Sequence, residues 1–187
     1  MRSLSRQKDE GVQVLIKKTI GTFRPSDSDK LAMIKAKQKI MLDGVKINYE
    51  SGHLLAQKTC LVCHAFYGEG SHVGPDLTGV GRSTIEALLH NVIDPNEIIG
   101  AGYENTLVET RDHRSLAGRL IENTDDHIKL LSAGDKEDVV GKGEIASMRT
   151  EKISVMPEGL VDTMPDDDLR NLLWYIFSPP QEHKKNP

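Results

Sequence analysis

The spacing of apolar residues predicts several helices. In the closing segment, apolar residues from Leu169 to Phe177 recur at i, i+3, i+4, i+7 and i+8, which is the repeat of one helix face. The same repeat follows Ser83-Thr84-Ile85-Glu86, a sequence of the capping-box form, and Pro95 ends it. A further helix is expected to run from Ser51 into residues 60–64.

Two plainer helices are expected before residue 50. The first stops near Gly21, and Ser28 or Asp29 is a suitable N-cap for the second. They are interpreted as packing helices or as a linker to a preceding domain.

Between residues 104 and 151 the period of the pattern changes to about two, the repeat of a strand. Strands are expected at residues 106–111, 116–122 and 127–132, with shorter candidates at 139–140 and 145–148. Polar turns separate them, which favours a small antiparallel sheet or barrel. The predicted fold class is therefore mainly α, with an inserted small antiparallel β subdomain.

Composition narrows the classes of function. The chain has 187 residues with a formal net charge of −4, and its acidic and basic residues are interspersed, which argues against nucleic acid as a partner. No apolar run approaches the roughly 20 residues of a membrane span, so none is expected in this chain. Residues 1–10 contain neither an apolar core nor a small-residue cleavage site, so no secretory signal is predicted there.

The chemistry is concentrated in one short motif. Both cysteines of the chain lie in Cys60-Leu61-Val62-Cys63-His64, the C-x-x-C-H pattern of c-type haem attachment. Two thiols one helical turn apart can each bond one vinyl group of a porphyrin, and the next residue, His64, then offers its imidazole to the iron. The motif predicts one covalently bound haem c.

Three other interpretations of the motif compete with haem. A structural zinc site needs a second pair of ligands, and the chain has no other cysteine. A thioredoxin-like dithiol needs a βαβ context, whereas helix and a Gly-rich loop flank this motif. A structural disulfide would give His64 no role.

The opposite face of the iron needs a second ligand, and the residues alone leave several candidates. Three histidines are expected to be solvated surface groups: His90, His113 and His127. His53 lies on the cysteine-bearing helix, so it cannot easily reach the opposite face of the haem. His72, in a loop, is a weak possibility. Met156 and Met164 each precede a proline. Met156 lies in an extended segment, whereas Met164 stands before the last helix, where it is expected to act as a hydrophobic staple.

Together these segments resemble a class I cytochrome c domain, and more narrowly the Pirellula/Verrucomicrobium-type haem-binding domain. The resemblance covers about residues 50–178. The matching residues, in chain order, are Gly52, Cys60-Leu61-Val62-Cys63-His64, Gly74-Pro75-Asp76-Leu77-Thr78-Gly79, Asp94-Pro95-Asn96, Gly102-Tyr103, Ser154-Val155-Met156-Pro157-Glu158-Gly159-Leu160 and the segment from Asp168 to Ile176. Two positions depart from the family pattern: Ala56 replaces an aromatic residue, and Pro165 replaces a small polar helix cap.

The resemblance implies a cytochrome c-like fold and the roles of three further residues. Met156 would be the distal ligand, the Pro75 carbonyl would accept the Nδ1–H of His64, and Leu77 would pack near the haem edge. The expected domains are a helical lead-in at 1–49, a haem domain at 50–103 and 152–178, a β insertion at 104–151 and a C-terminal tail at 179–187.

The function that we predict is one-electron transfer through a haem with His64 and Met156 as axial ligands. The chain is expected not to be an enzyme but an electron carrier, serving a redox partner protein or a fused dehydrogenase domain of a larger oxidoreductase. Haem attachment implies an extracytoplasmic, periplasmic location. The alternatives are a haem sensor or gas-binding module with a displaceable Met156, a small peroxidase, and an interaction module that docks through the β insertion.

Overall fold

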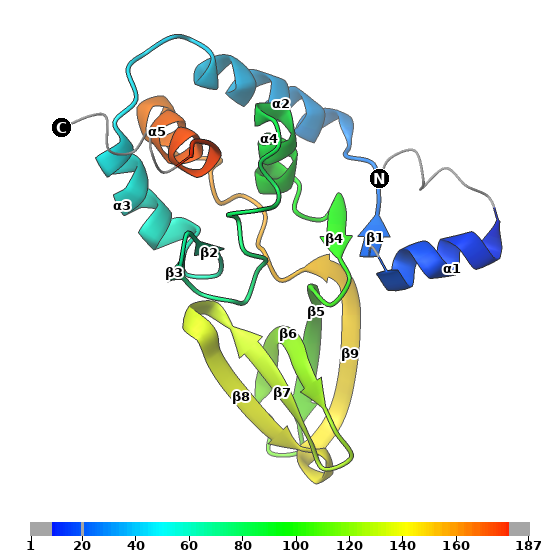
Figure 1. Ribbon diagram of the computed structural model, residues 1–187. Coiled ribbons are helices and arrows are strands. Elements are labelled where there is room, and N and C mark those ends of the chain that lie inside the picture. Colours follow the sequence, from blue (N-terminus) through cyan, green and yellow to red (C-terminus); the bar gives the residue numbers. More distant parts are fainter. Residues whose placement is uncertain (1–8, 20, 180–187) are drawn as a thin grey trace. The chain divides into compact units, whose positions relative to one another are not determined.

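A computed structural model describes residues 9–19 and 21–179 of the chain (Figure 1). The expectation of no signal peptide at residues 1–10 falls almost entirely outside the described residues, as does the tail expected at 179–187. The helices are α1 (Glu10–Thr19), α2 (Ser28–Met41), α3 (Tyr49–Thr59), α4 (Ile85–Ile93) and α5 (Asp166–Phe177). The strands are β1 (Gly21–Phe23), β2 (Ala65–Phe66), β3 (Glu69–Gly70), β4 (Ile98–Gly100), β5 (Glu104–Thr110), β6 (Ser115–Asn123), β7 (His127–Ser132), β8 (Lys136–Gly141) and β9 (Ile145–Ser154).

The prediction of a mainly α fold is wrong. Over the described residues, five helices accompany a five-stranded antiparallel sheet, so the fold is mixed α and β. The sequence pattern underestimated the sheet because its two outer strands are longer than expected. β8 has six residues and β9 has ten, and most of their side chains are exposed, so hydrophobic alternation marks them poorly.

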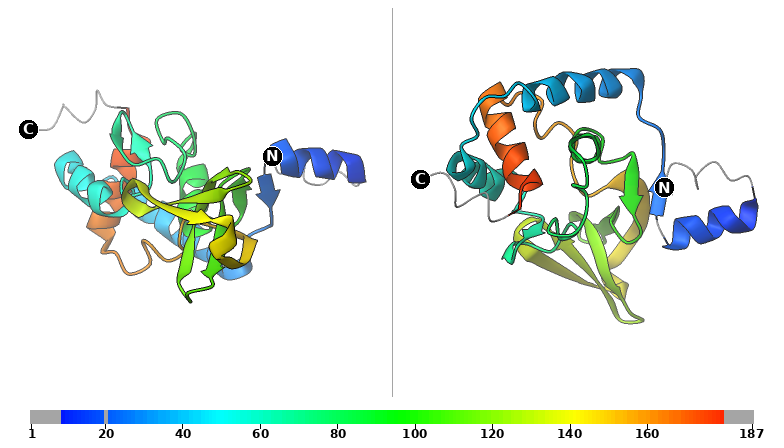
Figure 2. Two further views of the ribbon diagram at one scale, coloured as in Figure 1. Left: turned by 90° about the horizontal axis from the view of Figure 1, so that it is seen from below. Right: turned by 45° about the horizontal axis from the view of Figure 1, so that its top comes forward.

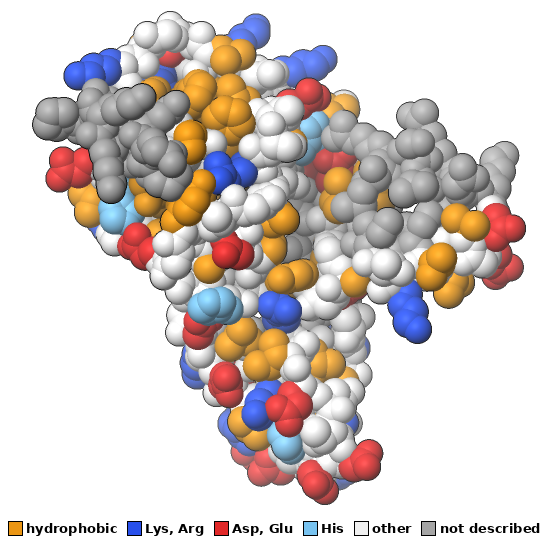
Figure 3. Space-filling view, in the orientation of Figure 1, with side chains coloured by type: hydrophobic (Ala, Val, Ile, Leu, Met, Phe, Trp, Pro, Cys, Tyr) orange, Lys and Arg blue, Asp and Glu red, His pale blue; other side chains and the backbone are white. Residues whose placement is uncertain are grey.

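The described chain divides into two compact units. The first contains α1, β1 and residues 96–156, and in it the large sheet has the strand order β8-β7-β6-β5-β9. A small core of Val108, Ile128, Leu130 and Val140 lies within this sheet, and each of these side chains is fully buried. β1 and β4 form a separate antiparallel pair. Acidic and basic side chains are interspersed on the visible face of the sheet in Figure 3, with no large patch of one sign.

The second unit consists of residues 26–95 and the described residues from 157 onward, and it contains α2, α3, α4 and α5. Apolar side chains from all four helices form its core, with Ile34 and Met41 from α2, Ala56 from α3, Leu88, Leu89 and Ile93 from α4, and Leu169, Leu172, Leu173, Tyr175 and Ile176 from α5. α3 and α5 lie side by side (Figures 1 and 2).

Gly52 sets how closely α3 and α5 approach. A Cβ at this position would lie 2.3 Å from the backbone oxygen of Asn171 and 2.8 Å from Cβ of Tyr175. Ala56, one turn further along α3, is completely buried in the same core. Ala56 stands where the family that the sequence resembles usually has an aromatic residue, and its small side chain fits this core.

Two helix starts, those of α4 and α2, differ in detail from expectation. Thr84, and not Ser83, caps α4 by accepting a hydrogen bond from the Ala87 amide at 3.0 Å. α2 is capped by Asp27. α5 starts after Pro165, whose side chain makes no capping bond, and three aspartates occupy its first turn, where the helix dipole favours negative charge. No helix in the described ranges is both long and apolar enough to cross a membrane.

Candidate functional site

The two cysteines lie in a tight turn that continues from the end of α3. Cys60 is the C-cap residue, and its amide donates to the Ala56 carbonyl at 2.8 Å. The amides of Cys63 and His64 both donate to the Cys60 carbonyl, at 3.1 and 2.9 Å. This turn keeps three potential ligand groups within one short segment. Both cysteines are half-buried thiols and not a disulfide.

Burial of the Cys60 thiol disfavours its thiolate form. Burial raises its pKa, although Thr59, whose hydroxyl lies 3.5 Å from Sγ, opposes the shift. Redox-active dithiols depend on a lowered pKa, because the thiolate is the reactive form. The environment of Cys60 instead keeps the sulfur protonated at neutral pH.

The His64 imidazole is held in one tautomer. Its Nδ1–H donates to the Pro75 carbonyl at 2.8 Å, so the proton resides on Nδ1. Within the described part of the chain, Nε2 has no hydrogen-bond partner. Burial lowers the pKa of His64, although the hydrogen bond to Pro75 opposes this shift. The lowered pKa favours the neutral ring. A neutral imidazole with a bonded Nδ1–H and an available Nε2 is the form in which histidine binds metal ions.

A glycine loop encloses the His64 ring. A Cβ on Gly74 would lie 2.4 Å from Cε1 and 2.6 Å from Nδ1 of His64, so only glycine fits there without displacing the ring. The Gly74 amide donates to the Cys63 carbonyl at 2.7 Å, and the Leu77 amide donates to the Ala65 carbonyl at 2.8 Å. The loop is therefore fastened to the backbone on both sides of His64.

Arg82 holds the far end of this loop, a role that sequence reasoning missed. Its guanidinium donates to the carbonyls of Leu77 and Thr78 at 2.7 and 2.9 Å, and to that of Phe177 at the end of α5 at 2.9 Å. It also lies 5.2 Å from the centre of the Phe66 ring, within the range of a cation–π contact. A single arginine in a loop has no sequence signature, so only the folded structure reveals these contacts.

The other histidines have varied surroundings. His90 was expected to be a solvated surface group, but it is only 7% exposed on the buried face of α4. His53 pairs with Glu69 at 2.7 Å and stacks on Tyr175. His113 and His127 lie at hairpin turns, as expected, and His127 pairs with Glu122 at 3.0 Å. His72 is exposed.

The structure brings Cys60, Cys63, His64, Pro75 and Leu77 together in the second unit, and Leu77 packs against the core of that unit. Met164 also packs against this core. Met156 is the last residue of the first unit. Its amide donates to the Ser154 hydroxyl at 3.1 Å and its side chain is half-buried.

Cys60, Cys63 and His64 are the types of donor that a covalently bound haem would require of the protein. In the described ranges, no group of three or more His, Cys, Asp or Glu side chains is arranged to hold a metal ion. A haem brings four nitrogen ligands of its own, so the protein has to supply only thiols for attachment and axial ligands.

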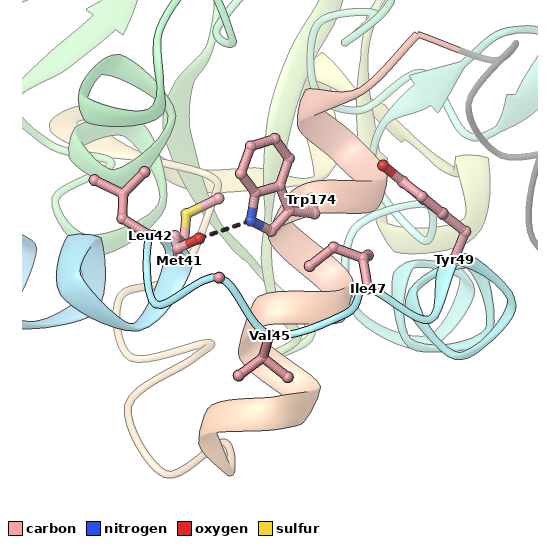
Figure 4. Close-up of a pocket in the computed structure, with 7 residues that line it drawn as sticks. Met41, Leu42, Val45, Ile47, Tyr49 and Trp174 are labelled. Atoms are coloured by element: carbon pink, nitrogen blue, oxygen red, sulfur yellow. Dashed lines mark hydrogen bonds between the residues drawn. The ribbon is translucent and has the colours of Figure 1, made fainter.

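The second unit also has an apolar cavity of about 260 Å³, which is separate from the cysteine motif (Figure 4). It is lined by Met41, Leu42, Gly44, Val45, Ile47, Tyr49 and Trp174. The indole Nε1–H of Trp174 donates to the Met41 carbonyl at 2.9 Å and fixes one wall. None of the predicted ligands lines this cavity, so it is not the expected haem position.

A scan against protein-family models and a search of curated proteins both give no match for this chain.

Proposed function

We propose that this chain is a c-type cytochrome domain that transfers single electrons. Cys60 and Cys63 would hold haem as thioethers, His64 would be its first axial ligand, and Met156 its second. The observation that carries the proposal is the state of His64, which directly follows the two thiols and whose ring is fixed by Pro75 and Gly74.

This observation favours haem over the other interpretations of the motif. A redox dithiol gives the adjacent histidine no need for a fixed tautomer, and the raised pKa of Cys60 runs against thiolate chemistry. A protein that binds haem through a histidine needs a neutral, oriented ring, because disorder in the ligand weakens the bond to iron. The contacts of His64 with Pro75 and Gly74 meet that need.

When bound, the haem would supply an iron centre that alternates between Fe(III) and Fe(II). The chain's own contribution is to hold the ligands still. The Pro75 carbonyl keeps the proton on Nδ1 and increases the basicity of His64, and a thioether sulfur from Met156 would favour Fe(II) and raise the potential. Its partner would be a redox protein or a fused dehydrogenase domain, and its location would be extracytoplasmic, where c-type haem is attached.

Expression with a haem c maturation system tests the proposal. The purified wild-type chain should retain its haem after extraction with acidified organic solvent, because thioether bonds survive this treatment. A Cys60→Ser/Cys63→Ser variant provides the matched control and should release any haem it contains. A colourless wild-type protein, or one whose haem extracts freely, would refute covalent attachment.

Carbon monoxide then distinguishes an electron carrier from a gas-binding module. If Met156 is a firm ligand, the reduced protein should bind CO slowly and weakly. Rapid, tight binding would show an open or displaceable sixth position and would favour a sensor or a small peroxidase over the electron carrier.

A further inference from the structure

The segment that follows Met156 is fastened to α2 by two lysines. Lys30 Nζ lies 2.7 Å from a carboxylate oxygen of Glu158, and Lys37 Nζ donates to the Val161 carbonyl at 2.8 Å. All four residues belong to the second unit. The two lysines are about two turns apart on α2. Their partners are close together in the segment, so residues 158–161 are held at both ends.

Lys37 occupies an unusual position for a lysine. The buried face of α2 consists of Ile34, Lys37 and Met41, and Lys37 is only 8% exposed. Burying an ammonium group is costly unless it finds polar partners, so a helix that served only for packing would favour an apolar residue here. The bond to the Val161 carbonyl gives the buried ammonium group a partner, and it also fixes the backbone of the segment.

Lys30 links the same segment to a second helix. Its ammonium lies 3.0 Å from a carboxylate oxygen of Asp94, the C-cap residue of α4, and the Asp94 side chain is fully buried. The Lys30 side chain is 18% exposed. The ammonium group that pairs with Glu158 is therefore also paired with a buried carboxylate, whereas the Glu158 side chain itself is 43% exposed.

From these contacts we infer that Lys30 and Lys37 are positioning residues for the Met156 ligand, an inference that rests on the proposed function. Only Pro157 separates Met156 from Glu158, so fixing residues 158–161 limits the distance over which the thioether can move. A restrained ligand loses less conformational entropy when it binds, which favours Met156 over water or CO as the sixth ligand.

The test compares variants that release the segment with variants that do not. Lys30→Gln and Lys37→Met each remove an ammonium group and keep much of the side-chain length, and Glu158→Gln removes the charge from the other side of the first ion pair. Lys35→Gln is the matched control, because Lys35 is an exposed residue of the same helix. Lys30→Arg tests rescue, since it retains the charge.

Four measurements are made on each haem-loaded chain: hydrogen exchange, the near-infrared band, the potential and CO binding. Hydrogen exchange at the amides of residues 158–162 should be about tenfold faster in Lys30→Gln, Lys37→Met and Glu158→Gln than in the wild type, a factor that corresponds to about 1.4 kcal/mol. The same three variants should have a weaker near-infrared sulfur–iron band, a lower potential and faster CO binding. Lys35→Gln should match the wild type in all of these measurements, and Lys30→Arg should largely restore them.

Each outcome has a defined meaning. Faster exchange with an unchanged band and potential would overturn the positioning role and leave the lysines purely structural. If Lys37→Met fails to fold, the more exposed changes Lys30→Gln and Glu158→Gln decide the question. A wild-type chain without covalent haem would overturn the proposed function and this inference together, whereas an intact haem with no response to the variants overturns only the inference.

Discussion

Replacing Gly74 with alanine probes the enclosure of His64 with a single methyl group. The Gly74 backbone is not in the left-handed region, so alanine can adopt its conformation. The new Cβ would nevertheless lie 2.4 Å from Cε1, 2.6 Å from Nδ1 and 2.9 Å from Nε2 of His64. Carbon atoms in ordinary contact are about 3.5–4.0 Å apart, so the ring or the loop has to move by about 1 Å.

Such a displacement has two costs. Overpacking a tight site typically destabilises a protein by about 1–3 kcal/mol. If the ring rotates away, the 2.8 Å bond from Nδ1 to the Pro75 carbonyl is also weakened, which adds about 0.5–1.5 kcal/mol. The expected loss of stability is therefore about 2–4 kcal/mol. The same motion withdraws the Nε2 ligand, so the haem-loaded variant should have a lower affinity for iron at this position.

Urea unfolding of the variant and of the wild type measures the first effect, and the absorption spectrum of the haem-loaded protein measures the second. Gly79→Ala is the control, because Gly79 lies in the same loop and its Cβ would have no atom within 4 Å. This control should be neutral or more stable by about 0.4–1 kcal/mol, since alanine restricts the unfolded chain. Equal stability and spectra for the two variants would refute the argument that Gly74 encloses His64.

Three further predictions test other parts of the structure. Met156→Ala should abolish the near-infrared sulfur–iron band and allow CO to bind. Met164→Ala should keep the band and lose up to about 2–5 kcal/mol of stability in urea unfolding. The reverse pattern would overturn the assignment of Met156 as the ligand. Gly52→Ala should lower the stability measured by urea unfolding by about 1–3 kcal/mol, because the new Cβ would lie 2.3 Å from the α5 backbone. An unchanged urea midpoint would contradict this packing of α3 and α5. Hydrogen bonds from Gln57 and His53 lower the pKa of Glu69 below its usual 4.5. The contribution of this ionised carboxylate to the free energy of unfolding is therefore present above pH 4.5 and is lost as the pH falls through the lowered pKa. Acid unfolding of Glu69→Gln should show less of that dependence, and an identical acid profile would show that these hydrogen bonds are not maintained in solution.

The helices of the second unit were largely predictable from sequence, and so was the existence of the sheet. Apolar residues repeat every three to four positions in α4 and α5, since each helix buries a single face. The expected strand at 127–132 coincides with β7, whose central residues Ile128 and Leu130 are fully buried. β8 and β9 were underestimated because most of their side chains are exposed, which leaves too little alternation to mark their ends.

The exposure of single residues was less predictable. His90 was expected in solvent because the apolar stripe of its helix lies on another face, yet the buried face of α4 is wide enough to include it. Lys37 stands on a buried face for a different reason. Lysine is typical of protein surfaces, and only a carbonyl from a distant segment makes its burial possible here.

By itself, the sequence determined which side chains stand together in the candidate site and the local elements that carry them. The spacing of Cys60, Cys63 and His64 is a local property, because a turn of backbone fixes their separation whatever the rest of the chain does. Only the tertiary structure decided that Gly74 encloses the imidazole, that Gly52 brings α3 against α5, and that Lys30 and Lys37 hold the segment after Met156. These contacts join residues that are distant in the chain, and no periodic pattern encodes such pairs, because each depends on how complete helices and loops pack together.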